Sequence, residues 1–145
     1  GNNHAVVRID KLDPKTNTVT SKTCVPYHYV PDKNKLVKGK GDAPWEPYRI
    51  DDIEHHLSPK WVLWVEGEKC VETSRMELNV FTITVDGSSW NDVGITYAVN
   101  CLISRNIQGI IYMPDNDEPG KKKAQLVEKI AAERGIKCVT VDLTD

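Results

Sequence analysis

The second half of the chain alternates short apolar runs with amphipathic runs, and this alternation constrains the fold more than any other feature. Each apolar run has the length and β-branched content of a strand buried on both faces. Four such strands separated by three helices predict a parallel sheet joined by right-handed crossovers, with helices on both faces. The expected fold is a Rossmann-like α/β sheet. The apolar runs are WVLWV, VFTITV, IQGIIYM and KCVTV, and the helical runs are EKCVETSRMEL, DVGITYAVNCLIS and KKKAQLVEKIAAERG.

The first part of the chain has a different pattern. Residues 4–30 form two β-like runs around an Asp-Pro and Asn-rich turn, which predicts a β-hairpin. A loop rich in Pro, Gly and Lys follows, and residues 49–57 then carry apolar residues at the spacing of a short helix. Because the pattern changes near Pro59, we expect a β-rich segment over 1–59 and an α/β domain over 60–145.

Composition narrows the possible classes of protein. The 145 residues include 19 Lys and Arg against 21 Asp and Glu, a net charge of −2, so any nucleic-acid surface must be local. No apolar run approaches the ~18 residues of a membrane span, and no signal peptide is evident, so we expect no membrane association and a cytoplasmic location. The chain begins with Gly1 and stops at Asp145 just past an apolar strand, which favours a domain taken from a longer polypeptide.

Acidic residues follow two of the predicted strands. Glu66 comes after the first strand, and Asp115 and Asp117 come after the third. If these strands are neighbours, in a sheet of order 2-1-3-4, the acids meet at the carboxyl edge, where α/β sheets bind ligands. Clustered carboxylates suit a hard cation, so the pattern predicts a Mg²⁺ site, with Mn²⁺ as a possible substitute. Taken singly, each motif is better explained by a turn or a helix cap, and only the two together, at the ends of two strands, favour the metal site.

Other residues near these acids are candidates for binding phosphate or nucleic acid. The Gly-Ser-Ser loop after the second strand offers amides and hydroxyls, and several lysines start the helices that follow the acids. Solvated positions on a helix face are the alternative for the lysines. Trp90, beside the serine loop, is the best candidate for stacking on a base. The phosphate or nucleic-acid candidates are Lys69, Gly87, Ser88, Ser89, Lys121 and Lys122, with Lys123 next to them.

The paired motifs resemble those of the TOPRIM domain, which bacterial primases, topoisomerases and some nucleases share. VLWVEGEKCVE matches its glutamate motif, PDNDEPGKKKA its aspartate pair, and VDGSSW the loop between them. The likeness is greatest to primase-like replication proteins of phages and plasmids, and it covers residues 61–141 well. One departure is Cys70, which stands where many primase-type sites carry an aspartate.

The resemblance implies Mg²⁺-dependent phosphoryl or nucleotidyl transfer in DNA replication. It implies that Glu66 is a general acid/base or metal ligand and that Asp115 and Asp117 hold Mg²⁺. The expected partners are a single-stranded DNA template, nucleotides, and a helicase or further domains of the same polypeptide. Two alternatives stay open: a strand-cleaving module of the nuclease or topoisomerase type, and a non-catalytic metal- and nucleic-acid-binding domain of a helicase-primase. We expect residues 1–145 alone to show little activity.

Overall fold

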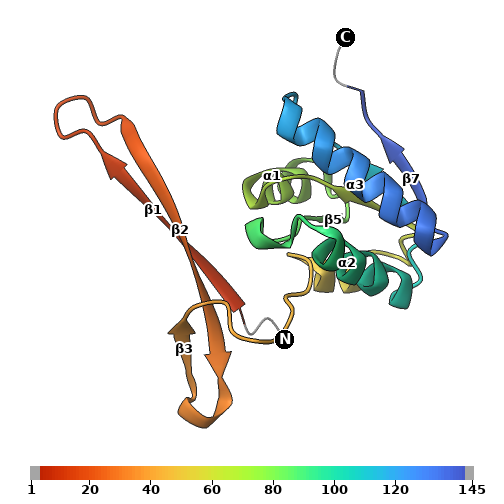
Figure 1. Ribbon diagram of the computed structural model, residues 1–145, viewed down its shortest axis with the longest axis horizontal. Coiled ribbons are helices and arrows are strands. Elements are labelled where there is room, and N and C mark those ends of the chain that lie inside the picture. Colours follow the sequence, from red (N-terminus) through yellow and green to blue (C-terminus); the bar gives the residue numbers. More distant parts are fainter. Residues whose placement is uncertain (1–3, 143–145) are drawn as a thin grey trace. The chain divides into compact units, whose positions relative to one another are not determined.

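The computed structural model describes residues 4–142, and the chain divides into two compact units, Gly1–Ala43 and Pro44–Asp145 (Figure 1). We call them the β unit and the α/β unit. The division falls at Ala43 and not near Pro59, where the sequence pattern changes.

The β unit is a three-stranded antiparallel sheet of order β1-β2-β3. Its strands are β1 (His4–Leu12), β2 (Val19–Val30) and β3 (Lys35–Lys38), with a 3₁₀ turn, η1 (Pro31–Lys33), before β3. The predicted hairpin is therefore confirmed. The third strand falls where a loop was predicted, because Asn34 adopts a left-handed conformation (φ 47°) that turns the chain back onto β2.

The α/β unit contains a four-stranded parallel sheet of order β5-β4-β6-β7, which confirms the predicted order 2-1-3-4. Its strands are β4 (Trp61–Trp64), β5 (Thr82–Ile83), β6 (Gly109–Tyr112) and β7 (Lys137–Thr140). The connecting helices are α1 (Glu68–Leu78), α2 (Asp92–Ser104) and α3 (Glu118–Arg134), with a 3₁₀ turn, η3 (Gly87–Ser89), before α2.

Helices cover both faces of this sheet, as predicted. On one face, alternate strand residues such as Val62, Trp64 and Ile110 pack with α2 and α3 in the main core. On the other face, Leu63 and Val65 pack with Val71 of α1 in a smaller core. This division follows from the two-residue period of a strand.

Residues 44–56 lie within the compact α/β unit, upstream of the first predicted strand. Ile50 is buried in the main core, and the Tyr48 amide donates to the Thr84 carbonyl oxygen over 2.7 Å in an isolated antiparallel bridge. The predicted short helix is a 3₁₀ helix, η2 (Ile50–His55). The attachment of this segment to the sheet was not evident from the sequence, because it depends largely on polar contacts to distant residues.

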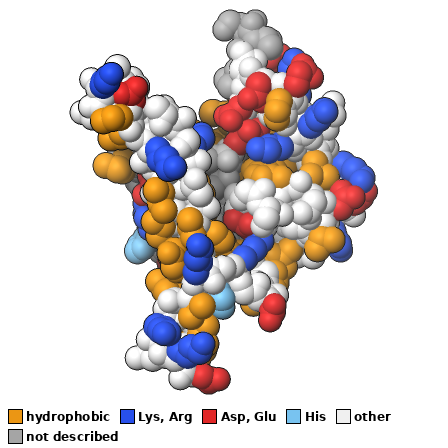
Figure 2. All heavy atoms as spheres, turned by 60° about the vertical axis from the view of Figure 1, so that its left-hand side comes forward, with side chains coloured by type: hydrophobic (Ala, Val, Ile, Leu, Met, Phe, Trp, Pro, Cys, Tyr) orange, Lys and Arg blue, Asp and Glu red, His pale blue; other side chains and the backbone are white. Residues whose placement is uncertain are grey.

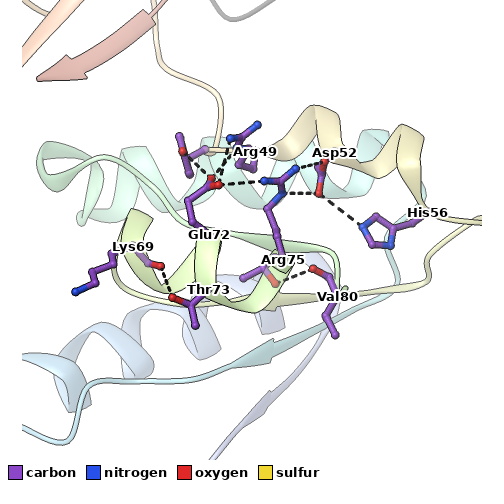
Figure 3. Close-up of polar contacts among 10 residues, drawn as sticks. Arg49, Asp52, His56, Lys69, Glu72, Thr73, Arg75 and Val80 are labelled. Atoms are coloured by element: carbon purple, nitrogen blue, oxygen red, sulfur yellow. Dashed lines mark hydrogen bonds and ion pairs between the residues drawn. The ribbon is translucent and has the colours of Figure 1, made fainter. Parts of the chain in front are cut away.

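Those contacts form an ion-pair network with α1, which we call the clasp (Figure 3). Arg75 of α1 donates to both Asp52 carboxylate oxygens, over 2.8 and 2.9 Å, and to Glu72 over 3.1 Å. Glu72 also accepts from Arg49 and from the Tyr48 hydroxyl, each over 2.8 Å. The clasp fixes α1, which is separated from Glu66 only by its N-cap residue, Gly67.

Among residues 4–142, no helix is both long enough and apolar enough to cross a membrane.

Candidate functional site

Adjacent strands bring Glu66 and Asp115 to the same edge of the sheet. β4 pairs in parallel with β6, with Trp64 opposite Tyr112, and the Met113 amide donates to the Trp64 carbonyl oxygen over 2.9 Å. Both chains then leave the sheet at its carboxyl edge, one through Glu66 and the other through Asp115.

Glu66 is the buried centre of this edge. Its side chain is 4% exposed, and its Oε1 accepts a hydrogen bond from the Tyr112 hydroxyl over 3.1 Å. Its Oε2 lies 3.7 Å from Lys123 Nζ of α3. The Glu66 carboxylate therefore contacts a strand residue, Tyr112, and a helix residue, Lys123, and it lies next to the loop after β6.

Burial raises the pKa of Glu66, because a charged carboxylate is poorly solvated there. A hydrogen bond from the Asp115 backbone and one from Tyr112 act in the opposite direction, and the nearby Asp115 carboxylate raises the pKa further. Burial and the Glu66 carboxylate also raise the pKa of Tyr112. Lys123 lowers the pKa of Glu66, whereas the Glu66 and Asp115 carboxylates repel one another.

Asp117 caps helix α3. Its Oδ1 accepts from the Gly120 amide over 2.7 Å, as the helix-cap interpretation predicts. The cap uses only one carboxylate oxygen of Asp117. Metal binding by Asp117 therefore stays a prediction. Asp115 and Asp117 are both exposed, whereas the Glu66 side chain is almost fully covered.

The site is not a ready-made cage of acids. Across the described range 4–142, no three His, Cys, Asp or Glu side chains gather into a recognisable metal centre. Mg²⁺ keeps several of its waters and needs only one or two carboxylates together with substrate phosphates. Glu66 and Asp115 therefore suit Mg²⁺ as a donor set, with Asp117 next to them.

The chain starts α2 and α3 in the same way. Asn91 accepts from the Gly94 amide over 2.9 Å, as Asp117 does from Gly120. Two residues before each cap, a carbonyl oxygen faces the glycine: that of Ser89 at Gly94, and that of Asp115 at Gly120. The two helices thus begin at the same edge of the sheet with matching turns.

Gly120 is required by this close approach. A Cβ at Gly120 would lie 2.2 Å from the Asp115 carbonyl oxygen and 2.9 Å from Asp117 Oδ1. We expect Gly120→Ala to lower the free energy of unfolding by about 1 to 3 kcal/mol, because the acid loop must shift. Gly87→Ala is the control, since a Cβ there meets nothing within 4 Å. Urea denaturation measures both; equal stabilities would show that the loop is not tightly packed.

The Gly-Ser-Ser loop is organised by a residue that sequence analysis did not single out. Asp86 accepts from the Ser88 amide over 3.2 Å, from the Ser88 hydroxyl over 2.6 Å and from the Ser89 hydroxyl. Gly87 is exposed. Asp86 also acts on Glu68, whose pKa is raised by burial and then by the Asp86 charge. The sequence did contain a signal for this role, because Asp86 is the acidic residue that follows the second predicted strand.

The lysines differ in what they reach. Lys121 pairs with Glu118 over 3.2 Å, while Lys122 and Lys69 are exposed on their helices. Lys123 reaches Glu66 and also lies over the Trp90 ring, 4.8 Å from its centre. Of the three consecutive lysines, Lys123 is the one that forms an ion pair with Glu66.

Trp90 packs in an aromatic cluster with Trp64 and Tyr112. The ring centres lie 6.2 and 6.3 Å from Trp90, at tilted and edge-to-face angles. Trp90 is half-buried, so its ring closes the core beneath Glu66 as well as bordering the serine loop. Its predicted stacking on a base is untested by this packing.

A pocket of about 420 Å³ opens beside Asp115, between the start of α3 and the end of β7. Its size is in the range of small-ligand sites. The polar residues that line it are Asp115, Asn116, Lys121, Gln125, Glu128, Thr140 and Asp142.

No protein-family model matches this chain, and no curated protein matches it either.

Proposed function

We propose that the α/β unit is a TOPRIM-type, Mg²⁺-dependent nucleotidyl or phosphoryl transfer domain of a primase-like replication protein that acts in the cytoplasm. The observation that carries the proposal is the meeting of Glu66 and Asp115 at the carboxyl ends of adjacent parallel strands. The likeness of the two motifs to the TOPRIM pattern supports the same assignment.

In this proposal, Glu66, Asp115 and Asp117 hold the metal, which when bound neutralises charge on the transferred phosphate. Lys123 holds Glu66 in place and shares its charge. Tyr112 fixes the orientation of the carboxylate by donating to Oε1. The pocket beside Asp115 has a volume in the range of small-ligand sites, and in this proposal it takes the nucleotide.

The reaction product distinguishes the proposed primase-like function from its two alternatives. We expect a longer polypeptide carrying this domain to make primers on single-stranded DNA with nucleoside triphosphates and Mg²⁺, and we expect Glu66→Gln to abolish the product. Residues 1–145 alone should give little or none, because the α/β unit that carries the acids has a net charge of −6 and holds a template poorly beside them. Nicking of supercoiled plasmid, without primers, would select the strand-cleaving alternative. DNA binding without either product would select the non-catalytic one, and vigorous primer synthesis by residues 1–145 would contradict our expectation for the fragment.

A further inference from the structure

The charge of the chain is divided unevenly between its two units. The β unit, residues 1–43, has eight Lys and Arg against four Asp and Glu, a net charge of +4. The α/β unit has the remaining eleven against seventeen, a net charge of −6. The net charge of −2 is therefore the sum of an acidic α/β unit and a basic β unit. A basic unit of this kind attracts a polyanion.

The strand register sorts the side chains of the β unit onto two faces. Residues that pair directly across antiparallel strands share a face, and alternate residues along a strand do too. One face, which we call the tyrosine face, contains lysines and no acid in the paired part of the sheet. It consists of Ala5, Val7, Ile9, Lys11, Ser21, Thr23, Val25, Tyr27, Tyr29, Leu36 and Lys38.

The opposite face has a mixed character. It contains an acid, Asp10, which is held by Arg8 over 2.7 Å, and two lysines, Lys22 and Lys35. It therefore supplies a control surface on the same three strands.

The tyrosine face exposes apolar surface. Val7, Ile9 and Leu36 are 46%, 53% and 50% exposed, and none of residues 4–43 is buried. Figure 2 shows hydrophobic side chains along this unit with lysine and arginine side chains among them. A small sheet that buries so little of its own surface gains stability from a ligand that covers it.

We propose that the tyrosine face binds single-stranded nucleic acid. Charge complementarity indicates this ligand, because the face carries Lys11 near one end and Lys38 toward the other, with no acid in its paired part to repel a phosphate backbone. Tyr27 lies directly opposite Lys38, and Tyr29 lies two residues further along β2, so both rings share the face with Lys38. Bases of a single strand stack on such rings while lysines hold the phosphates, whereas a duplex conceals its base faces. This inference rests on the proposed function in one respect only, which is that the bound single-stranded nucleic acid is called a template.

The test measures binding of fluorescein-labelled oligo(dT) of 20 nucleotides to residues 1–145 by fluorescence anisotropy, at several salt concentrations. EDTA is present, so binding does not depend on the metal, and a Glu66→Gln protein should bind like the wild type. A failure of the proposed catalysis is thereby distinguishable from a failure of this surface.

The decisive comparison removes the same charge from either face. Lys11→Gln with Lys38→Gln should weaken binding about 25-fold at 0.1 M salt and lower the slope of log K against log salt by about 1.4, from two lost phosphate contacts. Lys22→Gln with Lys35→Gln, on the opposite face, should leave both the affinity and the slope near wild type. All four lysines are exposed, so the variants fold alike.

A stacking role for Tyr27 is tested by Tyr27→Leu. It should weaken binding about tenfold without changing the salt slope, because it removes a π-face and no charge. Circular dichroism checks that the sheet persists. The proposal is overturned if wild-type protein fails to bind oligo(dT) at low salt, if both lysine pairs weaken binding equally, or if Tyr27→Leu binds like wild type. It is also overturned if sedimentation shows a dimer through this face that Tyr27→Leu dissociates.

Discussion

Arg75→Met should cost the α/β unit about 3 kcal/mol of stability at neutral pH. The Asp52 side chain is only 8% exposed, and Arg75 meets both of its oxygens. Removing one partner of a buried pair leaves the other charge without compensation, and this commonly costs about 3 to 5 kcal/mol. The lower end applies because Arg75 is partly exposed and His56 remains 3.7 Å from Asp52. Methionine keeps the aliphatic stem, so the loss reports the charge.

The matched control is Arg134→Met, the same change at an exposed residue in the last turn of α3, which should shift stability by about 0.5 kcal/mol or less. Urea denaturation followed by tryptophan fluorescence measures both variants. Adding Asp52→Asn to Arg75→Met should recover part of the loss, because the stranded charge is then gone. Equal stability of the two methionine variants would show that the clasp does not hold residues 44–56 in place.

The clasp also determines the direction in which the stability of the α/β unit changes with pH. Hydrogen bonds from Arg75 hold the pKa of the Asp52 carboxyl below its ordinary value of 3.8. A lowered folded-state pKa contributes stability that is present above the unfolded value and is lost as pH falls through the folded value. The difference between wild type and Arg75→Met should therefore shrink as the pH is lowered below about 3.8.

Glu66→Gln should have opposite effects on stability and on metal binding. Burial raises the pKa of Glu66, so its charged form costs stability in the absence of a cation. A raised folded-state pKa gives stability that is present below the unfolded value and is lost as pH rises through the folded one. The metal-free variant should therefore be more stable than wild type at pH 7, and the two should converge at pH below the ordinary value of 4.5.

With metal the order should reverse. Wild type should gain RT ln(1 + [L]/Kd), about 1.4 kcal/mol at ten times Kd, or about 3 to 6 °C in Tm for a chain of this size. Glu66→Gln should lose most of that gain. A variant that loses stability in EDTA would show instead that Glu66 serves the packing of the core and that its ionisation does not oppose folding.

The sheet and the neighbouring positions of Glu66 and Asp115 were predictable from the sequence. Apolar runs of strand length mark β4 and β6, and parallel connections place their carboxyl ends at one edge. A helix cap was one of the two explanations for the Asp-Asn-Asp motif, and Asp117 is that cap, although α3 begins at Glu118, before the expected start at the lysines. These features depend on local pattern and on general rules of chain connection, both of which a single sequence carries.

Other features were not predictable because they depend on contacts between distant residues. The clasp joins Asp52 to Arg75 and Arg49 to Glu72, and charged residues have many possible partners in a sequence. Whether Lys123 or Lys121 reaches Glu66 depends on where α3 begins, since each residue turns the helix by about 100°. The role of Asp86 depends on its turn folding back onto Ser88 and Ser89.

The central claim is that the acids after β4 and β6 bind a divalent cation, and thermal melts test it most directly. Wild type and the double variant Asp115→Asn with Asp117→Asn are melted in EDTA, in 10 mM Mg²⁺ and in 10 mM Mn²⁺, with Ca²⁺-free buffers throughout. Asparagine caps a helix as well as aspartate does, so the variant should fold normally. The account predicts a metal-dependent rise in Tm for wild type and none for the variant. If both respond to metal alike, the two aspartates serve the turn and the cap alone, and the proposed metal site is contradicted.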